Sequence, residues 1–142
     1  MNAYIDMKER HQREVDDFPL FFAFNKEQFN EGMKKFGLSP NDTKKVYRLG
    51  NTGGYYRRKD AKRLNEMFYR HAKELQDAID GDASGDGFIF EMFNSELANH
   101  EYIVSGDVTD TLQALGITDE ELRGSEQLRH GLALAIRAQK SD

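Results

Sequence analysis

Residues 61–79, AKRLNEMFYRHAKELQDAI, have the most regular apolar spacing in the chain. The apolar side chains recur at steps of three and four residues, which places them on one face of an α-helix. They are Leu64, Met67, Phe68, Ala72, Leu75, Ala78 and Ile79. The segment therefore predicts a long amphipathic helix near the middle of the chain.

Before this helix the pattern predicts further ordered segments. Residues 3–16 read as a polar helix with a thin apolar stripe. Residues 18–24 are the most apolar stretch of the chain and fit a buried strand or an extended segment that crosses the core. Asn25, with Gln28 three residues later, has the pattern of a helix start, and Gly37 predicts the end of that helix.

A second short helix is predicted over residues 39–49. Ser39 is a suitable cap and Pro40 is favoured in the first turn of a helix. Residues 50–54, Gly-Asn-Thr-Gly-Gly, break this helix before the long one begins.

After the long helix the chain continues mainly as helix. The expected elements are a helix over 88–98, a short strand over 102–104, a helix over 108–115 and a last helix opened by Ser125. Thr118 and Glu121 have the spacing of a capping box, which marks one more helix start. We therefore expect a mainly α protein, a compact bundle of six to seven short helices with at most a small β element, in a single domain of residues 1–142.

The composition bounds the class of protein. Hydrophobic residues make up 38% and charged residues 32% of the 142, which is more polar than an average globular domain but not the profile of a disordered chain, and the length suffices to bury a core. Cysteine is absent, so disulfides, Cys-ligated zinc and thiol nucleophiles are excluded. The first residues have no apolar signal core and no run reaches transmembrane length. We expect a cytoplasmic protein that does not bind membranes.

Residues 44–63 form a basic segment with eight basic side chains and one acidic one, in a chain of net charge −5. The side chains that we expect to contact phosphate or nucleic acid are Lys44, Lys45, Arg48, Tyr55, Tyr56, Arg57, Arg58, Lys59, Lys62 and Arg63. Arginines bind phosphate through two hydrogen bonds, tyrosines stack on bases, and glycines let backbone N–H groups approach a phosphate. The alternative is a flexible, solvated loop that pairs with acidic parts of the chain.

Residues 64–142 are acidic, with 16 acidic and six basic side chains. Asp119, Glu120 and Glu121 begin a predicted helix, where carboxylates complement the helix dipole. The same three carboxylates would face the phosphate backbone if this helix read DNA, so a helix-turn-helix is not favoured. We expect this acidic surface to bind a basic partner or to mimic nucleic acid, whereas ordinary solubility explains the same charge.

Residues 80–91, DGDASGDGFIFE, imitate the calcium loop of an EF-hand. The candidate calcium ligands are Asp80, Asp82, Ser84, Asp86 and Glu91. Each of two registers lacks one element, because one puts Gly87 where a branched apolar residue is typical and the other puts Phe93 in place of the closing Glu. The alternative is a turn between two helices, with glycines for the backbone angles and aspartates that solvate it.

No pattern indicates an enzyme. The four histidines, His11, His71, His100 and His130, are scattered. His71 with Glu74, and Glu96 with His100, are helix neighbours that lack a third metal ligand. A Ser-His-Asp arrangement, a nucleophile elbow or paired carboxylates do not stand out. We therefore predict no catalytic residues and no cofactor, apart from calcium at the acidic loop.

Three blocks of the sequence resemble a known family. They are residues 18–37, FPLFFAFNKEQFNEGMKKFG, residues 87–102, GFIFEMFNSELANHEY, and residues 109–116, TDTLQALG. Together they resemble an uncharacterised family of small proteins found on phages and integrative elements of Gram-positive bacteria. That family has no assigned activity, so the resemblance carries over no functional residue. It implies a context, because accessory genes of such elements often encode regulators or inhibitors of host defence.

Three hypotheses follow. The first is a non-enzymatic accessory protein of a mobile element that binds a protein or nucleoprotein partner in the bacterial host, with inhibition of a defence nuclease (anti-CRISPR-like) as its specific form. The second is a small nucleic-acid-binding protein that uses the basic segment, residues 44–63. The third is an EF-hand-like calcium module at residues 80–91.

Overall fold

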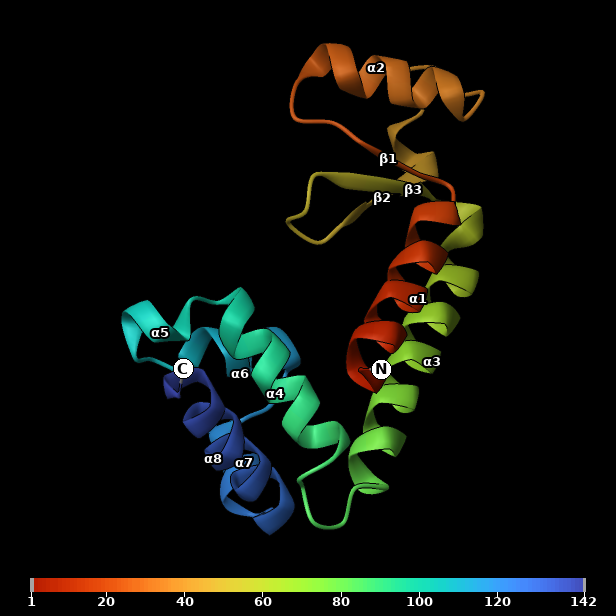
Figure 1. Ribbon diagram of the computed structural model, residues 1–142. Coiled ribbons are helices and arrows are strands. Elements are labelled where there is room, and N and C mark those ends of the chain that lie inside the picture. The colour runs from red at the N-terminus through yellow and green to blue at the C-terminus, as the bar shows by residue number, and fades with distance from the viewer. Residues whose placement is uncertain (1, 142) are drawn as a thin grey trace. The chain divides into compact units, whose positions relative to one another are not determined.

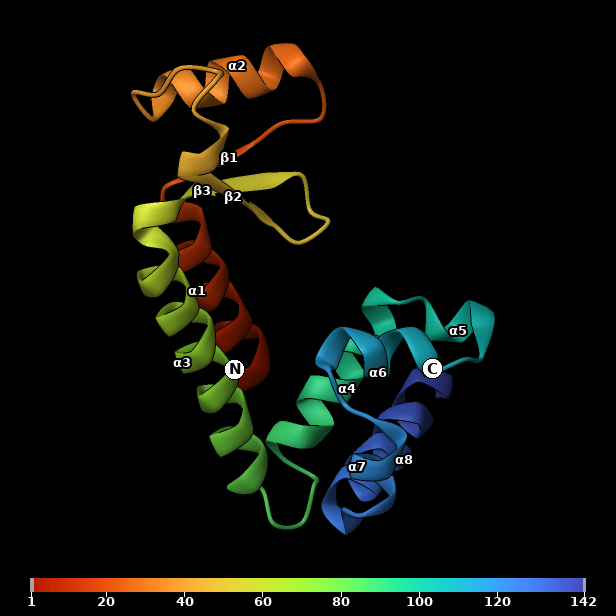
Figure 2. The same cartoon turned by 180° about the vertical axis from the view of Figure 1, so that it is seen from behind.

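The structure, a computed structural model, describes residues 2–141, which form eight α-helices, two 3₁₀ helices and one sheet of three antiparallel strands (Figure 1, Figure 2). The elements run in the order α1 (Ala3–Asp17), β1 (Leu20–Phe22), α2 (Lys26–Lys35), η1 (Thr43–Lys45), β2 (Val46–Leu49), β3 (Gly54–Arg57), η2 (Arg58–Asp60), α3 (Ala61–Asp80), α4 (Phe88–Asn99), α5 (Tyr102–Ser105), α6 (Thr109–Leu115), α7 (Asp119–Arg123) and α8 (Glu126–Lys140). The predicted fold class, mainly α with a small β element, is confirmed. In this part of the chain no helix is long and apolar enough to cross a membrane.

The described residues divide into two compact units. We call residues 11–72 the sheet unit, and residues 2–10 together with residues 73–141 the helical unit. The division falls inside α1 and α3, so each of these helices contributes residues to both units. The single domain of residues 1–142 stays a prediction.

In the sheet unit, α2 packs on one face of a sheet whose strand order is β1-β3-β2 (Figure 1). The register sets Phe21 opposite Tyr55, and Tyr55 opposite Arg48. Side chains of one row share a face, and Phe21 packs with Met33 of α2, so this row faces the helix. A Cβ added to Gly32 would lie 2.1 Å from the Phe21 ring, which explains the glycine at this crossing.

The start of α2 is built as predicted. The Asn25 side chain accepts the backbone N–H of Gln28, and the Gln28 side chain accepts the backbone N–H of Phe24, both at 2.8 Å. One unpaired donor of the first helical turn, the N–H of Gln28, and the N–H of Phe24 just before the helix are thereby satisfied. The helix ends at Lys35, and Gly37 follows with a φ of +73°.

The helix predicted over residues 39–49 is wrong. Residues 43–45 form a single 3₁₀ turn, and residues 46–49 form β2, which pairs antiparallel with β3. Val46 is buried whereas the next residue, Tyr47, is exposed, because successive side chains of a strand point to opposite faces. Cross-strand pairing and burial therefore outweigh the local signal for a helix.

The short strand predicted over residues 102–104 is also wrong, because Tyr102–Ser105 form one turn of helix, α5. Tyr102 is buried in the core of the helical unit, whereas Ile103 and Val104 are exposed. The turn begins after Glu101, which has a φ of +54°. Burial of the single aromatic side chain against α4 and α8 decides the conformation here rather than β-propensity.

Helix α4 is the centre of the helical unit. Its Ile89, Met92, Phe93 and Leu97 are fully buried, and it packs along α8. A Cβ added to Gly131 of α8 would lie 2.4 Å from Cγ2 of Ile89, so the two helices approach closely where α8 has no side chain. Because the buried side chains of α4 recur at steps of three and four residues, the helix could be predicted from the sequence.

The other predicted helices are confirmed. Helix α1 spans Ala3–Asp17 and α3 spans Ala61–Asp80, close to their predicted bounds. The capping box of Thr118 and Glu121 opens α7, and the Ser125 side chain accepts the backbone N–H of Leu128 in the first turn of α8.

Candidate phosphate-binding site

Two parts of the basic segment, residues 44–45 and residues 57–59, lie together at the end of the sheet where β2 begins and β3 ends. Val46 opens β2 and pairs with Arg57, the last residue of β3. The 3₁₀ helices η1 and η2, which precede β2 and follow β3, are therefore in contact. The hairpin thus brings two basic stretches together that the loop of residues 50–53 separates in sequence.

A cavity of about 590 Å³ lies at this place. Its lining residues are Phe36, Leu38, Lys44, Lys45, Arg57, Arg58 and Lys59. Five of the seven are cations and none is acidic, so the lining is strongly positive. Phe36 and Leu38 follow α2 and supply an apolar wall. The cavity therefore has positively charged side chains beside an apolar surface from which a ligand would displace water.

One of the five cations is fixed by a partner within the protein. Arg57 donates a hydrogen bond from Nε to Oδ2 of Asp60 at 2.7 Å, and Asp60 is buried. The guanidinium of Arg57 also lies 5.4 Å from the centre of the Phe36 ring, where a cation–π contact is favourable. Asp60 therefore orients Arg57 and offsets its charge.

The other four cations of the cavity, Lys44, Lys45, Arg58 and Lys59, form no ion pair within residues 2–141. All four are exposed. Four positive charges are therefore available to an anion, in a lining where like charges repel each other in its absence. A phosphate, with several acceptor oxygens, suits donors of this kind.

Three more residues of the predicted site lie on the sheet. Arg48 and Tyr55 belong to the face covered by α2, and the Tyr55 ring stacks on Phe21 with 5.1 Å between centroids. Tyr56 lies on the opposite face of the sheet, because it follows Tyr55 in the same strand. The structure therefore gives Tyr55 a packing role and leaves Tyr56 beside Tyr47, with ring centroids 5.8 Å apart.

Lys62 and Arg63 lie in the first turn of α3 and do not line the cavity. Lys62 is 4.0 Å from Glu66, and Arg63 is 3.7 Å from Asp60. The Arg63 guanidinium also lies 5.1 Å from the centre of the Phe18 ring. These two cations are therefore engaged within their own unit.

Sequence reasoning missed Phe36 and Leu38 as parts of the site. The sequence pattern accounts for Phe36 only as an apolar residue near the end of the helix that starts at Asn25, and nothing in the pattern marks Leu38. Tyr47 falls within the helix predicted over residues 39–49 and among the tyrosines of the basic segment, and the structure places it exposed on β2. The glycines of the loop between residues 46–49 and 54–57 were a signal that could have indicated a hairpin.

The acidic loop, residues 80–91, is closed by its own hydrogen bonds. The Asp82 carboxylate accepts the backbone N–H groups of Gly85, Gly87 and Ile89 at 3.1, 3.0 and 2.9 Å. These bonds tie the loop to the start of α4. The cap residue Gly87 has no side chain, so the Asp82 carboxylate accepts the backbone N–H of Ile89 in its place.

The other predicted calcium ligands each have a separate partner. Asp80 accepts a bond from Gln76, Asp86 accepts one from Ser84, and Glu91 accepts the backbone N–H of Ala3. Within residues 2–141, no three histidine or acidic side chains are grouped so that they could hold a metal ion. Calcium binding at this loop stays a prediction.

The three acidic residues of the predicted partner surface, Asp119, Glu120 and Glu121, form the first turn of α7 and are exposed. Glu121 also completes the capping box, accepting the backbone N–H of Thr118 at 3.2 Å. Their placement is as predicted, and binding of a partner there stays a prediction.

Glu96 of α4 is a buried carboxylate that sequence reasoning considered only with His100. Lys8 donates to it at 2.8 Å, and Tyr4 and Asn99 also donate to it. Burial would raise the pKa of Glu96, but these hydrogen bonds outweigh burial and the pKa lies below its ordinary value. Burial, with the bond to Glu96, raises the pKa of Tyr4. The cluster ties α1 to α4 within the helical unit.

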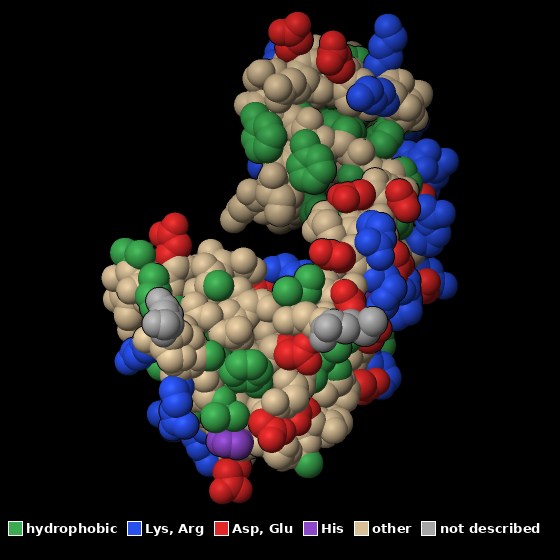
Figure 3. Space-filling view, in the orientation of Figure 1, with side chains coloured by type: hydrophobic (Ala, Val, Ile, Leu, Met, Phe, Trp, Pro, Cys, Tyr) green, Lys and Arg blue, Asp and Glu red, His purple; other side chains and the backbone are tan. Residues whose placement is uncertain are grey.

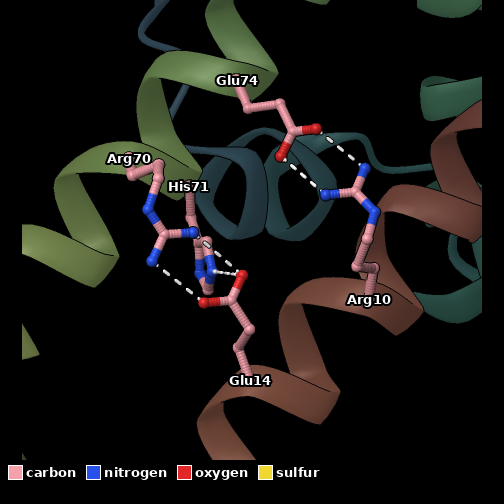
Figure 4. A network of polar contacts seen from close by, with 5 residues as sticks. All are labelled: Arg10, Glu14, Arg70, His71 and Glu74. Carbon is pink, nitrogen blue, oxygen red and sulfur yellow. Dashed lines mark hydrogen bonds and ion pairs between the residues drawn. The ribbon is translucent and has the colours of Figure 1, made fainter.

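A second polar network joins α1 to α3 (Figure 4). Within the sheet unit, Glu14 lies between Arg70, at 2.9 Å, and Nε2 of His71, at 3.2 Å. The hydrogen bonds from Arg70 and His71 lower the pKa of Glu14 to about 2. Within the helical unit, Arg10 binds both carboxylate oxygens of Glu74. The polar side chains of these pairs are satisfied by one another, so they do not indicate a ligand site.

Comparison with known proteins identifies the family. A family model for DUF7659, a family of unknown function, matches residues 3–138. The chain belongs to the DUF7659 family. Among curated proteins and among solved structures, no match to the chain was found. The expected membership of an uncharacterised family is thereby confirmed, and the DUF7659 match assigns no activity to the cavity.

Proposed function

We propose that this DUF7659 protein is a non-enzymatic binding protein that holds the phosphates of a nucleic acid or nucleoprotein in the basic cavity of its sheet unit. The cavity itself is the observation that supports the proposal. It gathers Lys44, Lys45, Arg58 and Lys59, which have no carboxylate partner within residues 2–141, on one lining. Neutralisation of phosphate charge by lysine and arginine is the main source of affinity in protein–nucleic acid complexes.

The apolar wall adds to the case for a phosphate ligand. Electrostatic attraction is stronger where water is displaced, and Phe36 and Leu38 line the same cavity as the cations. A solvated basic loop, the alternative reading of residues 44–63, needs no such wall and no contact between η1 and η2. The arrangement therefore favours a bound anion over a mobile basic surface.

A charge-reversal pair tests this proposal. The variant Lys44→Glu/Lys45→Glu is compared with Arg137→Glu/Lys140→Glu, which makes the same change in net charge on α8 in the helical unit. Binding of labelled single-stranded and duplex oligonucleotides is followed by fluorescence anisotropy. We expect the first variant to lose binding to both probes and the second to retain most of it. Equal affinities of wild type and the first variant would remove the cavity as the phosphate site.

A second, finer candidate is the accessory protein of a mobile element that inhibits a host defence nuclease in the bacterial cytoplasm. The family resemblance supports it, as does the exposed acidic turn of Asp119, Glu120 and Glu121. Its test is a pull-down from a Gram-positive host lysate, with and without nuclease treatment. A protein partner that survives nuclease and is lost when the three acids are changed to lysine supports this candidate. Recovery that depends on nucleic acid favours the basic cavity instead.

A further inference from the structure

The face of the sheet that α2 does not cover carries aromatic side chains. The register places Leu20, Tyr56 and Tyr47 in one row across the three strands. Side chains alternate along a strand, and the neighbouring row of Phe21 packs on α2, so the row of Tyr47 points to the other face. Phe22 lies on this second face for the same reason.

Two of these aromatic side chains, Tyr47 and Phe22, are at the surface, and Tyr56 is half-buried. Tyr47 is 40% exposed and Phe22 is 52% exposed, whereas Phe21, on the face that α2 covers, is only 7% exposed. Figure 3 shows hydrophobic side chains at the surface of the sheet unit. Large exposed aromatic groups gathered on one face are typical of an interaction surface rather than of random placement. We call Tyr47, Tyr56 and Phe22 the open face.

The open face adjoins the basic cavity through one residue. The guanidinium of Arg58 lies 5.6 Å from the centre of the Tyr47 ring, and Arg58 also lines the cavity. Tyr47 and Tyr56 meet edge to face, with ring planes inclined by 60°. If a ligand binds with a phosphate in the cavity, a flat, apolar group attached to that phosphate would lie beside Tyr47. A nucleotide has this combination of groups.

We propose that the open face binds single-stranded nucleic acid by stacking bases on Tyr47 and Phe22, with Tyr56 supporting Tyr47 and the backbone phosphates held in the cavity. This inference rests on the proposed function and names its ligand class. A sheet face with exposed aromatic rings binds bases whose faces are available, as they are in a single strand. In a duplex, each base is covered by its neighbours, so the open face would have no base to bind.

The test uses labelled oligothymidylate and oligouridylate about 12 nucleotides long, which is within the range of known single-strand sites, and a duplex of the same length. The variants are Tyr47→Ala and Phe22→Ala. Tyr69→Ala is the matched control, because Tyr69 is 72% exposed and belongs to α3 rather than to the sheet. Tyr47→Phe keeps the ring and tests whether stacking, rather than the hydroxyl, is responsible. Circular dichroism confirms that each variant is folded.

We expect Tyr47→Ala to weaken single-strand binding by about 5- to 150-fold, the range measured for one stacked base, while Tyr47→Phe and Tyr69→Ala bind as wild type. Duplex binding stays unchanged in all four variants. Unchanged single-strand affinity in both Tyr47→Ala and Phe22→Ala would overturn the inference. Similar effects on oligothymidylate and oligouridylate are expected, because stacking does not involve the 2′-hydroxyl.

A measurement without substitution keeps the inference testable should a variant fail to fold. The chain has no tryptophan, so its intrinsic fluorescence comes from tyrosine. Stacking of bases on Tyr47 should quench this fluorescence with the single strand but not with the duplex. Equal quenching by both probes would contradict the open face. If no probe binds the wild-type protein, the proposed function is contradicted. If both probes bind and binding is weakened by Lys44→Glu/Lys45→Glu but not by Tyr47→Ala or Phe22→Ala, only the inference about the open face is contradicted.

Discussion

Asp60 lies at the junction of η2 and α3 and accepts a hydrogen bond from Nε of Arg57 at 2.7 Å. Asp60 is buried and is the single acidic side chain of residues 44–63. Its carboxylate therefore sets the charge of the cavity, because it offsets Arg57 and leaves four lining cations without an ion pair within residues 2–141. The contact also holds the Arg57 guanidinium beside Phe36, so it fixes a cation of the cavity against the apolar wall.

Substitution Asp60→Ala removes this anchor. We expect it to lower the free energy of unfolding by about 1–3 kcal/mol, because Arg57 is only 27% exposed and would lose its charged acceptor. Glu66→Ala is the control, since Glu66 pairs with Lys62 at the surface, where such pairs contribute about 0–1 kcal/mol. Denaturant unfolding monitored by circular dichroism measures both. Similar losses in the two variants would show that the Arg57–Asp60 contact is no stronger than a surface pair.

Glu96 predicts a pH dependence of stability. The folded pKa lies below its ordinary value of 4.5, because the donors Lys8, Tyr4 and Asn99 favour the carboxylate over the opposing effect of burial. The ionised form therefore stabilises the fold above about pH 4.5, and this contribution is lost as the pH falls through the lowered pKa. We expect Glu96→Gln to lower the free energy of unfolding at pH 7 by about 1–3 kcal/mol and to flatten its fall below pH 4.5.

Denaturant unfolding at a series of pH values measures this effect. Glu120→Gln is a suitable control, because Glu120 is exposed on α7. If Glu96→Gln and wild type lose stability in parallel below pH 4.5, the buried carboxylate is not responsible.

Asp82 gives a separate prediction for the acidic loop. Its carboxylate accepts three backbone N–H groups, so Asp82→Ala should lower the free energy of unfolding by about 1–3 kcal/mol. Asp86→Ala should change stability by less than about 0.5 kcal/mol, because Asp86 is exposed and accepts only from Ser84. The calcium hypothesis predicts instead that both variants lose a rise in Tm that calcium produces and EDTA reverses. A wild-type Tm indifferent to calcium and EDTA would leave the loop as a turn.

The single domain of residues 1–142 predicts one cooperative unfolding transition. Helices α1 and α3 each belong to both units, so neither unit can unfold without disrupting a helix of the other. Circular dichroism reports mainly on the helices, which occur in both units, and tyrosine fluorescence reports on the three tyrosines of the sheet together with Tyr4, Tyr69 and Tyr102 on helices. We expect the two transitions to coincide in denaturant. Two separated transitions would show that the units unfold independently.

The helices were predictable because their signals are local. Residues 61–79 carry an apolar stripe, and Thr118 with Glu121 satisfies the first backbone donors of α7 through side chains only three residues apart. Strand β2 was missed for the opposite reason. Ser39 and Pro40 favour a helix locally, whereas the strand is stabilised by pairing with β3 on the far side of the loop.

The candidate site was predicted in composition but not in geometry. Residues 44–63 indicated phosphate contact by their cations, tyrosines and glycines, and Lys44, Lys45, Arg57, Arg58 and Lys59 do line one cavity. The wall formed by Phe36 and Leu38 could not be predicted, because it depends on where α2 ends over the sheet. Nor could the open face, because a one-residue change of register would move Tyr47 to the core.

The salt dependence of oligonucleotide binding tests the central claim most directly. Four available cations predict that the logarithm of the association constant for a single strand falls with the logarithm of salt concentration with a slope of roughly −2.8. In the Lys44→Glu/Lys45→Glu variant binding should be lost, while Arg137→Glu/Lys140→Glu should keep the wild-type slope. A wild-type protein that does not bind at low salt, or a slope near zero, would contradict a phosphate-binding cavity.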